Sequence, residues 1–598
     1  MKRRASAALL LAIVFALTIG IPAYAQDSTP EPSPDGEGVV TTWIPIGGFY
    51  ADTFPGFIEA AYQNVARFET DRLYILVMPM TFSVDATTLT PDDLLLNTRD
   101  SERRRRQLED VCRAMIPVET YCQVVTPPIY IREAAQSPEA LEYFADDLAG
   151  VYFLGGDQTI AMQITAGTPL EEELAAAFAR GVVMGGNSAG LAIESRTMIG
   201  GYGGNEFGPE NAFRLGAVDI WNEGERRGLD FGVTSAVLEQ HFYERARIAR
   251  LLNAIVQDGV PGIGIGVDSF TGALIRDNNL LESAFGVYGG AILDVETLGA
   301  RGTATFDNAA EVLSVRNVLL HTFAPGDFSY DIAARQPSLT PSLTSISRAF
   351  ETLSVPEGSG TLTLIGGEPS DPSILNVTPG TAALFTGYAD SDATTQAMTL
   401  YKDTGVDLID LHDASEMPDL SGYDQIIIHA GDASLVNVEL IREPLQDFWL
   451  AGKPLVFVGD AAGIVARRYT AMPPTPYDSD DEQIVAATQG TLLDGGVLVR
   501  EGLRLLEASV EPRLMADNRW GRLIAMAYQN PDLLAIGIPD ETIIVIDSTG
   551  ARVEGGNSAV TLDLRLSQRT LGTNGGFIIV NGVLDLFAPG DVIAPLSF

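Results

Sequence analysis

The sequence predicts an α/β protein made of two tandem three-layer α/β/α domains with mostly parallel sheets. Short apolar runs alternate with helix-compatible segments, which is typical of parallel strands that helices cover on both faces. Several apolar runs end in paired glycines, as at Gly47-Gly48 and Gly155-Gly156. A series of these motifs returns in the same order later in the chain, which indicates two copies of one unit.

The length of the chain requires more than one hydrophobic core. Its 598 residues are 46% hydrophobic and 20% charged, a composition typical of folded globular domains. We expect a first domain at 41–335 and a second at 360–598. Residues 336–359 are rich in Ser, Thr and Pro and are expected to form a linker, with one short helix inside it.

The start of the chain, at 1–25, has the features of a secretory signal peptide. A charged stretch, Lys2-Arg3-Arg4, precedes an apolar run at 7–21 and the cleavage pattern Ala23-Tyr24-Ala25. An uncleaved anchor is the alternative, but the apolar run is short for a membrane span. We expect a secreted or extracytoplasmic protein with no membrane span after signal removal and a flexible linker at 26–40.

The net charge of the chain limits the macromolecules that it can bind, and its cysteines and histidines indicate whether it has a disulfide or a metal site. The formal net charge is −41, and loss of the three positive charges of the signal takes it to about −44. So acidic a surface argues against nucleic acid and anionic membranes as partners. Cys112 and Cys122 are expected to form one local structural disulfide. The two cysteines and four histidines show no ligand spacing, so we predict no metal and no cofactor.

The first half contains the elements of a parallel sheet in order. Strands are expected at 41–46, 73–80, 124–131 and 150–154, and helices at 55–70 and 171–180. Four arginines at 103–106 could bind phosphate, but nearby acidic residues favour a solvated helix face. In such sheets the ligand site lies beyond the carboxyl ends of the strands, where Gly47, Gly155 and Ser188 are expected to lie.

The stretch Gly186-Asn187-Ser188-Ala189-Gly190 carries the main chemical signal. An apolar run ends in glycines, a serine follows between small residues, and a helix-compatible segment comes next. This is the pattern of a nucleophile elbow, a turn that raises a serine hydroxyl above the sheet. The alternative is a glycine-rich turn whose serine caps a helix.

A second signal follows at 237–250. A short extended segment leads to His241, and an arginine-rich helix is expected after it. On such a helix Arg247 and Arg250 would share a face, with Arg245 on an adjoining one.

The second half repeats these motifs without their chemistry. The spacing between the copies is almost the same from Ser188 to Ala461 as from Arg250 to Arg522, and it is longer from Gly47 to Gly366. Ala461 stands in place of Ser188 and Arg513 in place of His241, whereas most of the shaping glycines persist. The repetition of the motifs in the same order predicts a tandem duplication. The joint loss indicates that Ser188 and His241 belong to one chemistry and predicts that the second copy is a catalytically inactive pseudoenzyme domain.

Three motifs together resemble the cyanophycinase branch of the S51 serine peptidases, whose fold is similar to class I glutamine amidotransferases. They are G-G-D-Q at 155–158, G-x-S-A-G at 186–190 and E-Q-H-F-x-x-R-x-R-x-x-R at 239–250. The last run usually begins with Asp in the family, where this chain has Glu239. Where the family tends to show Asp-Glu, this chain has Asp268-Ser269.

The resemblance implies a serine-type peptidase with a Ser–acid–His triad. Ser188 would be the nucleophile and His241 its base. The acid is expected shortly after the elbow, which suggests Glu206, with Glu194 and Glu239 as rivals. The N–H groups of Gly156 (or Gly155) and Ala189 would hold the oxyanion.

The resemblance also implies cyanophycin, or a related Asp/Arg peptide, as the substrate. Cyanophycin is a poly-aspartate backbone with arginine on each side-chain carboxyl, and the implied reaction releases β-Asp-Arg dipeptides through an acyl-enzyme. Substrate contacts would come from one set of polar side chains: Gln158, Glu239, Gln240, Arg245, Arg247 and Arg250.

Two other functions stay open at this stage, an S51 peptidase acting on aspartyl dipeptides and a secreted binding protein without turnover. The family's tendency to pair also suggests that the two copies form an internal pseudo-dimer.

Overall fold

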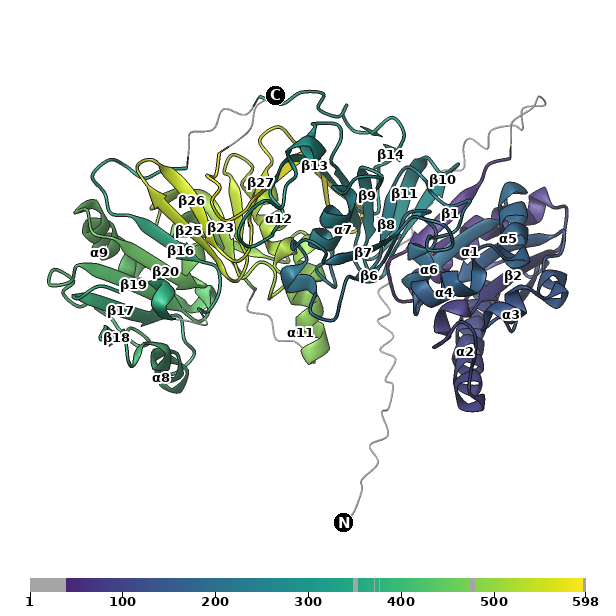
Figure 1. The fold of residues 1–598 in the computed structure, drawn as a ribbon, viewed down its shortest axis with the longest axis horizontal. Coiled ribbons are helices and arrows are strands. Elements are labelled where there is room, and N and C mark those ends of the chain that lie inside the picture. Colours follow the sequence, from purple (N-terminus) through teal and green to yellow (C-terminus); the bar gives the residue numbers. More distant parts are fainter. Residues whose placement is uncertain (1–38, 348–352, 370–371, 376, 474–478, 595–598) are drawn as a thin grey trace, which may run out of the picture. The chain divides into compact units, whose positions relative to one another are not determined.

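We analysed a computed structural model of the chain, which describes residues 39–347, 353–369, 372–375, 377–473 and 479–594 (Figure 1). Val40–Phe598 form one compact unit. The expected signal peptide, most of the 26–40 linker and the expected short helix around 348–352 lie outside the described residues. In the described ranges no helix is long and apolar enough to cross a membrane.

The first sheet confirms the expected parallel core. Among the described residues it has nine strands, in the order β15-β14-β11-β10-β1-β5-β4-β2-β3. Five of them are parallel: β1 (Thr42–Ile46), β5 (Val183–Asn187), β4 (Leu148–Phe153), β2 (Arg72–Met78) and β3 (Tyr121–Val125). The antiparallel edge consists of β10 (Thr271–Arg276), β11 (Leu280–Gly286), β14 (Tyr330–Asp331) and β15 (Gln336–Pro337).

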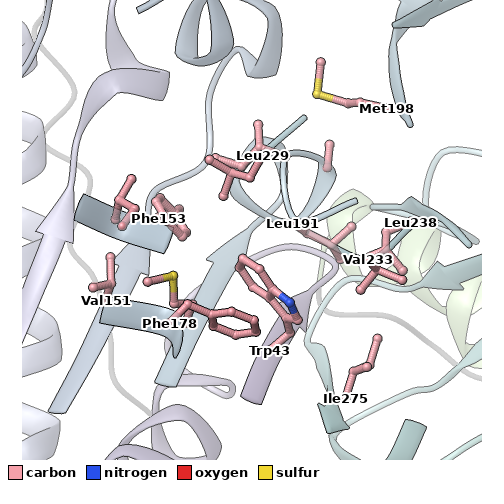
Figure 2. Close-up of a cluster of buried hydrophobic side chains, with 14 of the residues drawn as sticks. Trp43, Val151, Phe153, Phe178, Leu191, Met198, Leu229, Val233, Leu238 and Ile275 are labelled. Carbon is pink, nitrogen blue, oxygen red and sulfur yellow. The ribbon is translucent and has the colours of Figure 1, made fainter. Parts of the chain in front are cut away.

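Both faces of this sheet are covered because alternate side chains of its strands point to opposite sides. Leu73, Ile75 and Val77 of β2 pack in the core beneath α1 (Phe54–Arg67) and α2 (Pro91–Met115). Leu76 and Met78 join the core on the other face, with α4 (Gln158–Thr165), α5 (Pro169–Ala179) and α6 (Ala189–Ala192). Figure 2 shows that second core around Trp43, whose indole packs 4.5 Å from the Phe178 ring.

A second sheet, which the sequence analysis did not predict, joins the two halves of the chain. In the described ranges it has eleven strands and is largely antiparallel. The first half supplies β8 (Val237–Glu239), β9 (Ile263–Val267), β12 (Gly290–Asp294) and β13 (Val315–Phe323). The second half supplies β29 (Phe577–Phe587), β28 (Gln568–Leu571), β27 (Ala559–Asp563), β24 (Ala535–Ile538), β23 (Leu506–Pro512), β21 (Ala466–Ala471) and β22 (Leu498–Glu501).

The junction is the antiparallel pairing of β13 with β29, in which Leu319 lies opposite Val583. Helices α7 (Ile248–Ile255) and α12 (Trp520–Gln529), one from each half, contribute to a shared core against this sheet. A short hairpin, β6 (Met198–Tyr202) with β7 (Val218–Trp221), lies between the elbow and β8 in the chain.

The third sheet belongs to the second half and follows the strand order of the first. Its described strands are β18 (Asp407–Asp410), β17 (Thr381–Thr386), β19 (Gln425–Ala430), β20 (Leu455–Gly459), β16 (Leu362–Ile365), β25 (Thr542–Asp547) and β26 (Gly550–Gly555), in that order. The remaining helices are α3 (Arg132–Ala135), α8 (Ser391–Met398), α9 (Val438–Leu450), α10 (Ala461–Ile464) and α11 (Asp480–Ala487). The α/β class with mostly parallel sheets is thus confirmed for the first and third sheets, while the domain boundaries stay a prediction.

The two cysteines are bonded, as expected. Cys112 near the end of α2 is joined to Cys122 in β3. The bond closes a short loop and attaches the carboxyl-terminal end of a long helix to the sheet.

We predict that the Cys112→Ser, Cys122→Ser double variant has a free energy of unfolding lower by about 3 kcal/mol. A cross-link over a loop of this length reduces the conformational entropy of the unfolded chain, and the loss of that restriction stabilises the unfolded state by this amount. Thermal unfolding should show a lower midpoint, and reductant should lower the wild-type midpoint alone. An unchanged midpoint in the double variant would contradict this account.

Candidate active site

Ser188 occupies a strained turn between β5 and α6. Its backbone has φ 54° and ψ −113°, and its N–H donates to the Ile46 carbonyl at 2.9 Å. A Cβ on Gly186 would lie 2.2 Å from the Gly190 carbonyl carbon, so no side chain fits there. The turn therefore has the geometry expected of a nucleophile elbow.

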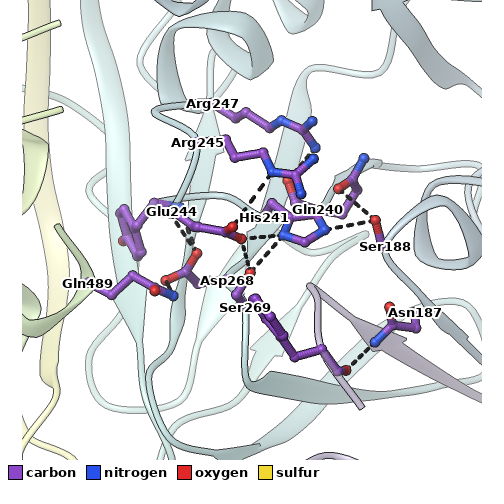
Figure 3. A network of polar contacts seen from close by, with 12 residues as sticks. Asn187, Ser188, Gln240, His241, Glu244, Arg245, Arg247, Asp268, Ser269 and Gln489 are labelled. Atoms are coloured by element: carbon purple, nitrogen blue, oxygen red, sulfur yellow. Dashed lines mark hydrogen bonds and ion pairs between the residues drawn. The ribbon is translucent and has the colours of Figure 1, made fainter. Parts of the chain in front are cut away.

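His241 lies directly against this serine. It follows β8, has φ 46°, and its backbone N–H donates to the Gly47 carbonyl at 2.8 Å. Its Nε2 lies 2.8 Å from Ser188 Oγ, which also lies 3.2 Å from Gln240 Oε1 (Figure 3). The structure thus brings together the two residues that the sequence analysis paired.

The carboxylate behind the imidazole is that of Glu244, not Glu206. Glu244 Oε2 contacts His241 Nδ1 and also accepts the Ser269 hydroxyl, while Ser269 Oγ lies 2.7 Å from the same Nδ1. Glu206 is exposed in the loop after β6, where its carbonyl accepts a bond from Asn211. Glu206 is therefore the wrong acid.

The two rival acids, Glu194 and Glu239, do not contact the imidazole either. Glu194 is fully buried, and burial raises its pKa well above the ordinary value. Glu239 is buried and bonded to Arg250. The useful signal in the sequence was the close spacing of His241 and Glu244, which one tight turn brings together.

The pKa shifts suit an acid–base pair. Burial acts to raise the pKa of Glu244, but the contacts with His241, Ser269 and Arg245 outweigh it and lower the pKa to about 2. Burial lowers the pKa of His241 below its ordinary value, against the opposing effect of Glu244. Because ionised Glu244 can only accept, the Nδ1 of neutral His241 carries the proton, and Nε2 is left to accept one from Ser188.

One of the proposed oxyanion donors, Gly156, lines a pocket beside Ser188, and the other, Ala189, is buried at the start of α6. The Gly155 N–H donates to the Tyr50 hydroxyl at 3.0 Å and is therefore engaged. In the described part of the chain, the N–H groups of Gly156 and Ala189 have no hydrogen-bond acceptor. Neither N–H is therefore engaged by another described residue, and that of Ala189 directly follows Ser188 in the chain.

Most of the side chains predicted to contact the substrate bond to other residues of the protein instead. Arg250 donates to both Glu239 oxygens at 2.9 and 2.7 Å, and Arg247 donates to the Gln240 carbonyl at 2.9 Å. Buried Gln158 donates to the Ile199 and Gly200 carbonyls.

The reason is that the helix begins at Ile248 rather than just after His241. Residues 241–247 form a turn that directs Arg247 inward, and Arg250 is buried within the helix. Of the three predicted arginines, only Arg245 lines the pocket.

The pocket beside Ser188 has a volume of about 860 Å³ and a mixed charge. Aromatic rings line part of it, including Phe49 and Phe270, which stack 4.2 Å apart. Its charged residues are Arg103, Arg104, Arg245, Asp52, Asp100 and Asp110.

Arg104 departs from the expected solvated helix face. The Arg104 guanidinium lies 4.0 Å from the centre of the Tyr50 ring and has no ion pair among the described residues. The outer residues of the run match the expectation, since Arg103 and Arg106 are exposed and lie 3.7 Å from Asp100 and 2.9 Å from Glu102. Across the described residues no group of His, Cys, Asp and Glu is arranged to hold a metal ion.

Curated relatives share part of this sequence. A cyanophycinase from Geminocystis herdmanii is 31% identical over 197 residues, which are 32% of this chain and 66% of the relative. One from Synechococcus elongatus is 31% identical over 189 residues, 31% of this chain and 54% of the relative. This chain is a relative of the S51 peptidases. It spans between about half and two thirds of the length of the curated relatives it matches.

No family model matches the chain. Among solved structures, a peptidase from an acI-B1 Actinobacterium aligns with a TM-score of 0.31 and 16% identity, over 43% of this chain and 92% of that one. A putative peptidase E from Listeria monocytogenes aligns with a TM-score of 0.23 and 12% identity, over 33% of this chain and 98% of that one.

In the second half of the chain, Ala461 and Arg513 stand at the positions that correspond to Ser188 and His241. Ala461 begins α10 after β20, and Arg513 has φ 55°, close to that of His241. Arg513 pairs with Asp517 at 2.7 Å. The turn at Arg513 therefore keeps the positive φ of His241, whereas Ala461 is helical and does not keep the strained conformation of Ser188.

We predict that Glu244→Gln lowers the pKa of His241 further, because the carboxylate favours the charged imidazolium. Titration by NMR of protein labelled at histidine would measure it, with the His241 signal assigned through its loss in His241→Asn. The matched control Glu206→Gln should leave the pKa unchanged. Equal shifts in both variants would refute the assignment of Glu244.

Proposed function

We propose that the protein is a serine exopeptidase of cyanophycinase type, which releases β-Asp-Arg dipeptides from cyanophycin through an acyl-enzyme. The observation that carries the proposal is the chain of contacts from Ser188 Oγ through the His241 imidazole to Glu244. A hydroxyl is a weak nucleophile at its own pKa, and this arrangement is the one that activates it.

The reaction follows from these contacts. Ser188 Oγ attacks the scissile carbonyl carbon while its proton passes to His241 Nε2. The N–H groups of Ala189 and Gly156 stabilise the oxyanion, and Glu244 stabilises the imidazolium.

Collapse of the tetrahedral adduct transfers the Nε2 proton to the leaving amine and leaves an ester on Ser188. Water then attacks this ester as His241 takes its proton. The serine is restored when that proton returns to it.

The mixed charge of the pocket supports a substrate that carries both carboxylates and guanidinium groups. Arg103, Arg104 and Arg245 can bind carboxylates, for which the planar guanidinium fork is suited. The three aspartates of the pocket can bind a substrate guanidinium in turn. Cyanophycin presents both groups, and the relatives named cyanophycinase support the same choice.

The second half enters the proposal as a non-catalytic copy that arose by tandem duplication and pairs with the first as an internal pseudo-dimer. The matching strand orders of the first and third sheets support a duplication. The pairing of β13 with β29 supports the pseudo-dimer. The signal-like start of the sequence supports secretion.

We predict that Ser188→Ala abolishes dipeptide release from purified cyanophycin, with a fall in kcat of at least ~10³-fold. Mass spectrometry of the released dipeptides measures this. Release by Ser188→Ala at the wild-type rate would refute the proposal. Hydrolysis of aspartyl dipeptides without release from cyanophycin would favour a different S51 activity, and binding without turnover a binding protein.

We predict that Arg104→Gln raises KM for cyanophycin ~10-fold with a smaller change in kcat, because it removes a partner for a substrate carboxylate. Arg245→Gln should raise KM and also lower kcat, because Arg245 lies 3.7 Å from Glu244 as well as lining the pocket. The matched control is Arg106→Gln on the same helix, which does not line the pocket. An unchanged KM in both pocket variants would exclude the arginines from substrate binding.

A further inference from the structure

The second half of the chain places two amide side chains against the turn that carries His241 and Glu244. Gln489 lies at the start of a short 3₁₀ helix, Gln489–Leu492, and Asn518 lies just before α12. Neither residue belongs to the elbow or to the pocket lining. Asn518 nevertheless contacts residues 243 and 244 directly, and Gln489 contacts them through the carboxylate of Asp268.

The first contact acts through Asp268, which is completely buried. Asp268 Oδ1 accepts the N–H groups of Tyr243 and Glu244, each at 2.9 Å. Its other oxygen, Oδ2, accepts the Gln489 amide at 2.8 Å (Figure 3). Burial raises the pKa of Asp268 to about 6, and these three donors oppose that rise by stabilising the ionised form.

The second contact is direct. Asn518 Nδ2 donates to the carbonyls of Tyr243 and Glu244 at 2.6 and 3.2 Å. The N–H and C=O groups of two consecutive residues are therefore all bonded, through Asp268 on one side and Asn518 on the other. The turn needs such support because His241 and Ala246 both have positive φ values, 46° and 51°, which are unfavourable for residues other than glycine.

The second half supports the turn of the first half in this way, but within the described ranges the first half does not support the corresponding turn of the second. At the spacing that relates Arg250 to Arg522, Asn518 corresponds to Ala246, which has no amide to offer the second half. Asp268 corresponds to Asp540 at the same spacing, and the buried Oδ2 of Asp540 has no hydrogen-bond partner among the described residues. The donors are therefore present only where the turn carries an imidazole and a carboxylate.

We propose that Gln489 and Asn518 are positioning residues of the active site, by which the second half holds Glu244 against His241. The inference rests on the proposed function, since it assigns these residues to the Ser188–His241–Glu244 chain. It gives the half without a nucleophile a defined task in catalysis by its neighbour.

The test uses the full chain with Asn518→Gly, Gln489→Leu and the double variant. Glycine keeps the positive φ of 50° at position 518 while removing the amide, so the fold is preserved. The double variant should lose ~10- to 100-fold in kcat for cyanophycin with a smaller change in KM, since Arg103 and Arg104 of the pocket lie on α2 and are untouched while the proton relay is misplaced.

A second readout needs no turnover. If Glu244 moves away from the imidazole, the pKa of His241 measured by NMR should fall in the double variant, because Glu244 raises it. The other charged groups that act on His241 are Arg245 and Arg247, and neither is substituted in these variants. A merely structural role for Gln489 and Asn518 would leave this pKa unchanged.

Asn557→Ala is the matched control. Asn557 also donates an amide from the second half to a carbonyl of the first, that of Glu210 at 3.0 Å, but does not contact the turn. It should retain the wild-type kcat and His241 pKa. A folded double variant with both values unchanged would overturn the inference, and so would equal losses in the control. Failure of the proposed function can be told apart from failure of this inference. If the proposed function is wrong, turnover by the wild-type protein will not depend on Ser188, but the pKa of His241 will still report on the position of Glu244 in the turn.

Discussion

The active site depends on one contact, that between the Glu244 carboxylate and the Nδ1 of His241. It fixes the tautomer of the imidazole and so decides that Nε2 faces Ser188 as an acceptor. The contact exists because a turn with two positive φ values follows β8 in place of a helix. That turn relies on bonds from Asp268, which directly follows β9, and from the second half.

Local sequence was enough to predict Ser188 and His241 as partners. The elbow is set by glycines within a few positions of the serine, and the two residues follow the ends of strands β5 and β8, which belong to different sheets. The α/β class followed from the same local patterns, because buried parallel strands are continuous apolar runs.

The acid and the arginines could not be predicted in this way. Whether Glu206 or Glu244 meets the imidazole depends on the path of the backbone after His241, and a helical path was assumed there. The start of the helix at Ile248 turns Arg247 inward, and Arg250 is bound to Glu239.

The largely antiparallel second sheet was also missed, and the reason is the distance along the chain between its central strands. Strand β13 comes from the first half and β29 lies near the end of the second, so that Leu319 pairs with Val583. Local patterns of apolar residues predict that each segment is a strand, but they carry no information on which distant strand it will pair with.

The central claim is that Ser188 forms the covalent intermediate with the aid of His241. Reaction with a fluorophosphonate, followed by peptide mapping by mass spectrometry, tests it most directly, since such probes modify serines activated by a neighbouring base. The account predicts one adduct, on Ser188, that disappears in His241→Ala. An adduct on another residue, or none on Ser188 in the folded wild-type protein, would contradict it.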